Sequence, residues 1–94
     1  MLVLKNKQEY LMEAIEKGLP DDVLRFLSQG ADVNAKGKDA DTPLHLAVEK
    51  GRKDIVSLLI AKGADVNGAG RYNEAPLHRA VLLGRKDMVE LLIA

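Results

Sequence analysis

Two histidines are the residues of this 94-residue sequence best suited to metal binding or acid–base chemistry. His45 and His78 each follow a Pro-Leu dipeptide and stand 33 positions apart. If these segments are neighbouring layers of one stack, their rings lie about 10 Å apart, too far to share one zinc ion. We therefore interpret both histidines as structural, and we expect no metal.

The acidic residues recur with the same spacing but do not form the carboxylate pair that general acid–base catalysis needs. Asp54 and Asp87 begin expected helices, and Asp32 and Asp65 lie in expected turns, so local capping explains all four. The glycines after Asn67 are not followed by the Lys-Ser/Thr of a phosphate loop. With no cysteine, a thiolate nucleophile is also excluded. The sequence predicts neither an enzyme nor a cofactor.

Charge gives no indication of a nucleic acid or membrane partner. Fourteen basic residues balance fourteen acidic ones, for a formal net charge of zero. The Arg-Lys pairs at 52–53 and 85–86 each precede an aspartate, so we interpret them as solvated surface charge. The longest apolar runs, at 58–61 and 91–94, are far shorter than the roughly 20 residues of a membrane span. We expect a soluble cytoplasmic protein.

The sequence contains an internal repeat of 33 positions, and this repeat defines the structural units on which these residues lie. Residues 42–61 and 75–94 are identical at fourteen of twenty positions, and Gly-Ala-Asp-Val-Asn at 30–34 recurs at 63–67. The first copy is degenerate and more polar, as a terminal repeat with one wet face requires. We expect a single domain, 1–94, made of a capping-type repeat at 1–36, a full repeat at 37–69 and a truncated repeat at 70–94.

Each copy predicts two short helices. Thr42 suits an N-cap, Pro43 suits the first helical position, and Gly51 ends the helix. In the first copy Asn6 and Glu9 form a capping pair. Helices of this kind are shorter than the roughly 12–15 residues at which isolated helices become marginal, so stacked neighbours must bury their apolar faces.

The motif Thr-Pro-Leu-His-Leu-Ala, then Gly, Ile-Val-x-Leu-Leu-Ile and Gly-Ala-Asp-Val-Asn, closely resembles the ankyrin repeat. The resemblance covers about residues 8–94. It implies an all-α fold, an ankyrin-repeat α-solenoid of helix–turn–helix units with short β-hairpin loops. It also implies a histidine bonded to a neighbouring loop. Its functional implication is a non-catalytic protein–protein interaction module, which grips partners with its loop tips and the exposed side of its first helices.

Three positions depart from the family pattern. Ala40 and Asn73 stand where the family mostly has glycine. Because alanine tolerates a positive φ poorly, the turn at 36–41 is expected to be strained or differently shaped. Ala75 replaces the capping threonine at a cost of about 1 kcal/mol.

Variation between the two similar repeats indicates where a partner binds. Positions 46, 49 and 50 differ from their counterparts and share one helix face, so Arg79, Leu82 and Leu83 replace Leu46, Glu49 and Lys50. Tyr72 and Arg79 are of the types enriched in interface hot spots, and with Arg71 and Leu82 they form the expected centre. Tyr72 bracing its own loop, and Leu83 awaiting a further repeat, stay open as alternatives. The candidate partner-binding residues are Lys38, Asp39, Asp41, Glu49, Lys50, Arg71, Tyr72, Glu74, Arg79, Leu82 and Leu83.

The alternative function is that of a structural scaffold or self-assembling unit. The sequence given stops at Ala94, before the third copy's Gly-Ala-Asp-Val-Asn segment. We therefore expect an uncapped apolar face around Met88, Leu91 and Leu92, through which the chain could self-associate. A fragment of a longer array or an engineered protein fits the same pattern, and the high identity between repeats fits design, although the irregular first copy does not.

Overall fold

The helix starts follow the local chemistry of the sequence. The computed structural model describes residues 5–37 and 39–94. The carboxamide of Asn6 accepts the Glu9 N–H at 2.8 Å, and the Glu9 carboxylate accepts the Asn6 N–H at 3.3 Å. Thr42 caps the next repeat's first helix and Pro43 occupies its first turn. The predicted capping pair and N-cap are confirmed.

Six α-helices form three successive helix–turn–helix pairs. The helices are α1 (Lys7–Lys17), α2 (Pro20–Ser28), α3 (Pro43–Glu49), α4 (Lys53–Ala61), α5 (Pro76–Leu82) and α6 (Lys86–Ile93). A short 3₁₀ helix, η1 (Arg71–Asn73), lies in the last long connection. The expected all-α class is confirmed.

The connections between pairs are turns, and no residue of 5–37 or 39–94 is in a strand. Backbone hydrogen bonds close each turn. Gly37 N–H donates to the Asp41 carbonyl and Gly70 N–H donates to the Glu74 carbonyl, each at 2.8 Å, and bonds of 3.0 Å run from Ala40 N–H to the Gly37 carbonyl and from Asn73 N–H to the Gly70 carbonyl. The expected β-hairpin loops are therefore present only as reversals of the chain direction, and their described residues do not form strands. Ala40 has a φ of 72°, in the left-handed region that strains an alanine, as the sequence predicted.

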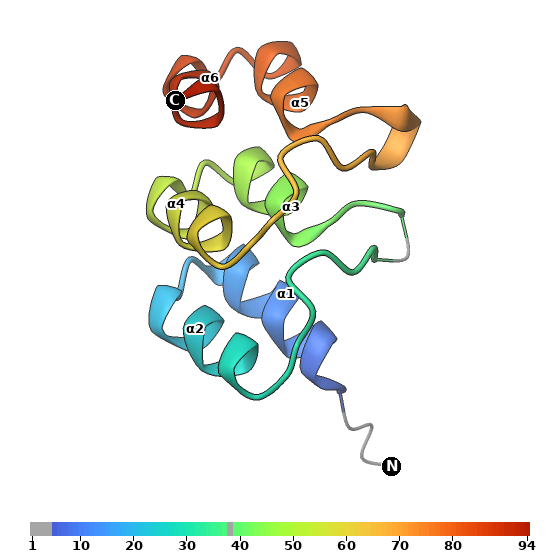
Figure 1. Cartoon of the computed structure of the whole chain (residues 1–94), viewed down its shortest axis with the longest axis vertical. Coiled ribbons are helices and arrows are strands. Elements are labelled where there is room, and N and C mark those ends of the chain that lie inside the picture. Colours follow the sequence, from blue (N-terminus) through green and yellow to red (C-terminus); the bar gives the residue numbers. More distant parts are fainter. Residues whose placement is uncertain (1–4, 38) are drawn as a thin grey trace.

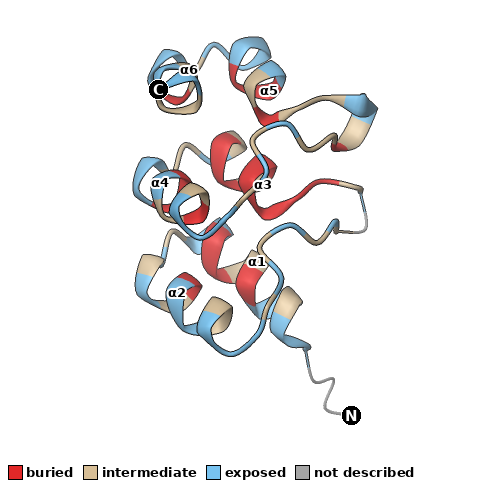
Figure 2. Ribbon diagram, in the orientation of Figure 1, coloured by how far each residue is buried: buried red, intermediate tan, exposed pale blue. Residues whose placement is uncertain are grey.

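The three pairs stack in register. The first helices α1, α3 and α5 form one column, α2, α4 and α6 form the other, and the two long turns project beside the first column (Figure 1). Neighbouring pairs bury leucine, isoleucine and valine between them (Figure 2). Residues such as Leu11, Leu44 and Leu59 are fully buried. Because the helices are 7–11 residues long, this burial between pairs is what stabilises them.

Candidate protein-interaction site

A buried ion pair joins the second and third helix pairs. Asp41 lies at the end of the first turn and Arg79 lies in α5. The guanidinium donates two hydrogen bonds, Nη1 to Oδ2 at 3.0 Å and Nη2 to Oδ1 at 3.1 Å. Asp41 is 4% exposed and Arg79 is 5% exposed. A two-pronged pair of this kind fixes the relative position of the two elements.

Other charged groups surround this pair. The backbone N–H of Arg71 donates to Asp41 Oδ1 at 2.8 Å, and Arg79 Nε donates to Glu74 Oε2 at 3.3 Å. Glu49 Oε1 accepts from both arginines, at 3.3 Å from Arg71 and 3.4 Å from Arg79. Burial raises the pKa of Asp41, but the hydrogen bonds from Arg79 and Arg71 outweigh burial and hold it below its usual value.

The structure corrects the expected exposure of two candidate residues. We expected Arg79 at the centre of an exposed patch and Asp41 at a loop tip, and both side chains are buried against each other. Arg71 and Glu74 are half-buried in the same cluster. The interpretation from helix periodicity was wrong at Arg79 because Asp41 of the preceding repeat's turn covers this part of the first-helix face. These four residues hold neighbouring repeats together.

His45 and Gly70 complete this junction. The His45 Nδ1 accepts the Thr42 N–H at 3.2 Å, so its ring proton is on Nε2, which donates to the Glu74 carbonyl at 2.7 Å. A Cβ added at Gly70 would stand 2.7 Å from both His45 Nε2 and Asp41 Oδ1. The predicted bond from the histidine to a neighbouring loop is confirmed, and glycine is required where that loop approaches.

Two arginines expected to be solvated instead bind backbone. Arg52 Nη2 donates to the Glu16 carbonyl at 2.7 Å, and Arg85 Nη2 donates to the Glu49 carbonyl at 2.9 Å. Each guanidinium reaches the carbonyl end of the previous pair's first helix, where unpaired carbonyls and the helix dipole favour a cation. Sequence reasoning missed this role, although the 33-residue recurrence of Gly-Arg was its signal.

Several candidate residues do lie on the surface. Tyr72 is 82% exposed at the tip of the second turn, and Leu82 is 70% exposed in α5. Leu83, Lys50 and Asp39 are also exposed. Lys38 lies outside the described residues. The backbone of Tyr72 has a φ of 61°, in the left-handed region that non-glycine residues rarely adopt.

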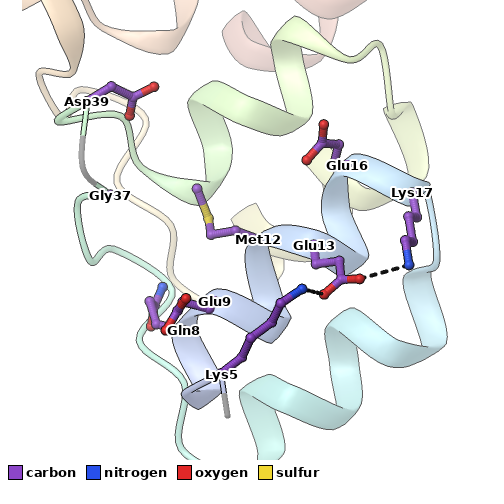
Figure 3. Close-up of a pocket in the computed structure, with 9 residues that line it drawn as sticks. All are labelled: Lys5, Gln8, Glu9, Met12, Glu13, Glu16, Lys17, Gly37 and Asp39. Carbon is purple, nitrogen blue, oxygen red and sulfur yellow. Dashed lines mark hydrogen bonds and ion pairs between the residues drawn. The ribbon is translucent and has the colours of Figure 1, made fainter. Parts of the chain in front are cut away.

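A groove of about 790 Å³ runs between α1 and the first turn. Met12 points into it from α1, and Gly37 and Asp39 border it on the turn side (Figure 3). Glu9 and Glu16 stand along the same helix. This groove is formed by one first helix together with one turn tip.

The groove has an apolar floor and an acidic border. Glu13 is paired with Lys17 at 2.8 Å and with Lys5. Hydrogen bonds from Lys17 and Lys5 lower the pKa of Glu13 to about 2, so this carboxylate stays ionised, and the two lysines balance its negative charge. Glu9 and Glu16 carry further negative charge beside it. Such a surface suits a polypeptide that presents an apolar side chain flanked by basic ones.

Comparison with protein families decides the identity of this stack. Residues 11–94 match ankyrin repeats, as three copies. The chain belongs to the ankyrin repeat family. Ankyrin repeats generally act as protein–protein interaction modules, and the family is typically not enzymatic. A comparison with curated proteins found no match.

The ankyrin pattern also identifies the groove residues that sequence reasoning missed. Glu16 and Lys17 stand 33 positions before Glu49 and Lys50, which were candidates. The signal was therefore in the sequence, but the degenerate first ankyrin repeat was interpreted only as a cap. Met12 had no such signal, because its role depends on the turn that lies opposite.

The expected self-association surface of this ankyrin stack needs correction as well. Met88 is fully buried, in contact with the core, so it is not available to a second copy. Leu91 and Leu92 are half-buried. The apolar side chains that α5 and α6 do expose are those of Val81, Leu82 and Ile93, together with Leu83 just after α5. The expectation failed at Met88 because its side chain faces the hydrophobic core and not the outer side of α6.

Within residues 5–37 and 39–94, no group of three or more His, Asp or Glu side chains is placed to hold a metal ion. None of the helices described is long and apolar enough to cross a membrane.

Proposed function

We propose that this ankyrin chain binds a partner protein through its turn tips and the exposed side of its first helices. The observation that carries the proposal is the groove between α1 and the turn at Gly37–Asp39, because a first helix and a turn together form one recess there. Its size of about 790 Å³ suits several side chains of a bound polypeptide.

The second turn adds an exposed aromatic anchor. Tyr72 presents 82% of its surface to solvent, and the Arg71 guanidinium lies 6.0 Å from the centre of its ring. Arg71 is itself anchored by Glu49 at 3.3 Å. A tyrosine supported in this way loses little conformational freedom on binding, which is a property of interface hot spots.

Asp39 and Lys50 belong to the proposed surface, whereas Asp41 and Arg79 support it from beneath. Lys38 stays in the proposal from the sequence alone. Glu49, Arg71 and Glu74 contribute by holding the second turn against α3 and α5. Leu82 and Leu83 extend the proposed contact along α5, where they are exposed.

The test begins with a protein that co-purifies with the chain. That partner is purified separately and titrated back onto the chain to measure its affinity. Met12→Glu places a charge on the floor of the groove, and Tyr72→Ala removes the turn anchor. We expect each change to weaken binding about tenfold or more. Tyr72→Ala is expected to leave the free energy of unfolding nearly unchanged, whereas Met12→Glu also loses packing against the core, so its unfolding free energy is measured alongside its affinity. Ser57→Ala, on the exposed side of α4, is the matched control and is expected to leave affinity unchanged. Equal affinity of the purified partner for all three variants would disprove the proposed surface.

A second candidate is a scaffold unit that joins further units at the end of the stack, with the chain divided into repeats at 1–36, 37–69 and 70–94. The exposure of Val81 at 61% and of Ile93 at 65% favours it. Self-assembly of copies is measured by light scattering over a concentration series. A mass that stays monomeric at millimolar concentration would exclude self-assembly.

A further inference from the structure

The residues that hold the second turn against the stack are replaced by different residue types at the first turn. At the second turn the polar contacts come from Asp41, His45 and Arg79. The residues 33 positions earlier in the sequence are Gln8, Met12 and Leu46. None of these three carries a charge, and two of them are apolar. The groove between α1 and the first turn therefore lies where the second turn has its buried polar contacts.

The floor of the groove is formed by Met12 beside the backbone of the first turn. His45, the counterpart of Met12, is fully buried under its turn, whereas Met12 is half-buried. A Cβ added at Gly37 would stand 3.9 Å from the Met12 Cε, so the methyl group lies close to the turn. The thioether is polarisable and adapts to the shape of an apolar side chain placed against it.

Gln8, the counterpart of Asp41, does not turn its polar group toward the groove. Its carboxamide donates to the Asp32 carbonyl at 2.8 Å and accepts the Asp32 N–H at 2.9 Å. Asp32 lies in the segment that follows α2. The polar atoms of Gln8 are therefore engaged by backbone outside the first turn.

Glu16 is the counterpart of a glutamate that two arginines hold. Glu49 Oε1 accepts from Arg71 at 3.3 Å and from Arg79 at 3.4 Å. For Glu16 the place of Arg79 is taken by an apolar leucine, and Lys38, the counterpart of Arg71, lies outside the described residues. The second junction thus provides a precedent for a guanidinium at this carboxylate.

Within the described residues Glu16 forms one ion pair, with Lys50 Nζ at 4.0 Å. The Glu16 side chain is 64% exposed and that of Lys50 is 38% exposed. An exposed pair at this distance contributes little stability. A guanidinium can donate two parallel hydrogen bonds to one carboxylate, so an arginine from a partner can displace the lysine ammonium from Glu16.

The groove is acidic although the chain as a whole is neutral. Four carboxylates border it against two lysines, which leaves two negative charges in excess: Glu9, Glu13, Glu16 and Asp39, with Lys5 and Lys17. Met12 and Glu16 are four residues apart and project from the same side of α1 (Figure 3). An apolar contact and a carboxylate are therefore neighbours within a field that attracts cations.

We propose that this groove binds a polypeptide segment in which an arginine adjoins an apolar residue. The guanidinium pairs with Glu16, and the apolar side chain lies on Met12. This inference rests on the proposed function and names the chemistry of its partner. The incoming arginine supplies to Glu16 the contact that Arg71 and Arg79 supply to Glu49. Lysine suits the site less well, because its ammonium is a single point charge that cannot form the two parallel hydrogen bonds.

The first experiment follows the ε-methyl NMR signals of the methionines during titration with N-acetyl-leucyl-arginine amide. Met12 reports directly on the groove, and Met88 is fully buried and serves as an internal control. We expect the Met12 signal to move saturably at about 1–10 mM of this small probe, while the Met88 signal stays in place.

Two further probes test the charge and the shape of the arginine. The citrulline analogue has nearly the same shape without the charge, and it is expected to bind about fivefold more weakly or less. The lysine analogue is expected to bind about twofold to fivefold more weakly than the arginine probe. A Met12 signal that responds equally to the arginine and citrulline probes, or to neither, would overturn the proposal.

Glu16→Gln tests the assigned carboxylate. We expect this variant to bind the arginine probe about fivefold more weakly, with no change for the citrulline probe. Glu90→Gln, at an exposed position of α6, is the matched control and is expected to bind both probes as the wild type does. Both glutamates are exposed, so neither change removes core packing. Equal affinity of the two variants for the arginine probe would refute the role of Glu16.

Titration with the purified partner separates this inference from the proposed function. If Tyr72→Ala weakens partner binding and the arginine probe leaves the Met12 signal unmoved, the turn surface binds the partner and the arginine inference is wrong. If the arginine probe moves the Met12 signal and the partner binds all the turn and groove variants equally, the arginine site is supported and the proposed function is wrong.

Discussion

Asp41 and Arg79 stand 38 positions apart in the sequence and meet through two hydrogen bonds of 3.0 and 3.1 Å. The pair joins a turn to a helix of the next repeat, and both side chains are buried. Loss of one partner leaves the other charge poorly solvated, so the junction between the second and third repeats depends on both.

Asp41→Asn is expected to lower the free energy of unfolding by about 2–3 kcal/mol, because Arg79 then retains only the weaker contacts with Glu49 and Glu74. Asp39→Asn is the matched control. Its carboxylate is exposed and 4.0 Å from Arg71, so a change of about 0.5 kcal/mol or less is expected. Urea denaturation measures both, and equal effects would contradict the assigned role of the buried pair.

The same pair predicts that the free energy of unfolding falls as the pH is lowered into the acid range. The pKa of Asp41 is lowered in the folded state, so the stability it contributes is present above its unfolded pKa of about 3.9. That contribution is lost as the pH falls through the lower folded value. The difference in unfolding free energy between the wild type and Asp41→Asn is expected to be constant from about pH 5 to 7 and to shrink below about pH 4. A difference that does not shrink on acidification would argue against the pair.

Gly70→Ala is expected to destabilise the chain by about 2 kcal/mol, because the new methyl group would stand 2.7 Å from His45 Nε2 and Asp41 Oδ1. Gly68→Ala is the control, since its nearest contact is at 3.4 Å and its backbone is not left-handed. Thermal unfolding distinguishes the two, and a benign Gly70→Ala would mean that the second turn is held less closely.

Ala75→Thr is expected to stabilise the chain by about 1 kcal/mol, since Ala75 has no side-chain oxygen to cap α5. The equivalent Thr42 accepts the His45 N–H at 3.4 Å and lies 2.8 Å from its Nδ1. Thr42→Ala provides the reciprocal control with a loss of similar size. If Ala75→Thr leaves the unfolding midpoint unchanged, the cap at this helix has no measurable value.

Helix ends and the stack were predictable because their causes are local or periodic. Asn6 with Glu9, and Pro43 after Thr42, specify helix starts within a few residues of sequence. The 33-residue period then implies that similar units lie side by side. No knowledge of the turn conformations was needed for either inference.

The candidate site was less predictable because exposure at its residues depends on neighbouring turns. Arg79 is on the side of α5 that helix periodicity places toward a partner, yet Asp41 of the preceding turn covers it. Met12 borders a groove only because Gly37 and Asp39 lie opposite. The comparison of the two similar repeats identified positions whose residues differ. It could not distinguish residues that contact a partner from residues that contact a neighbouring repeat.

The contacts of Arg52 and Arg85 make the unfolding of neighbouring repeats interdependent. When α6 melts, Arg85 leaves the end of α3, so α3 loses the cation at its carbonyl end. When α4 melts, Arg52 likewise leaves the end of α1. A fluctuation in one second helix therefore weakens the first helix of the repeat before it. The energetic linkage between repeats runs through these guanidinium groups as well as through the core, which favours a single cooperative transition over stepwise loss of repeats.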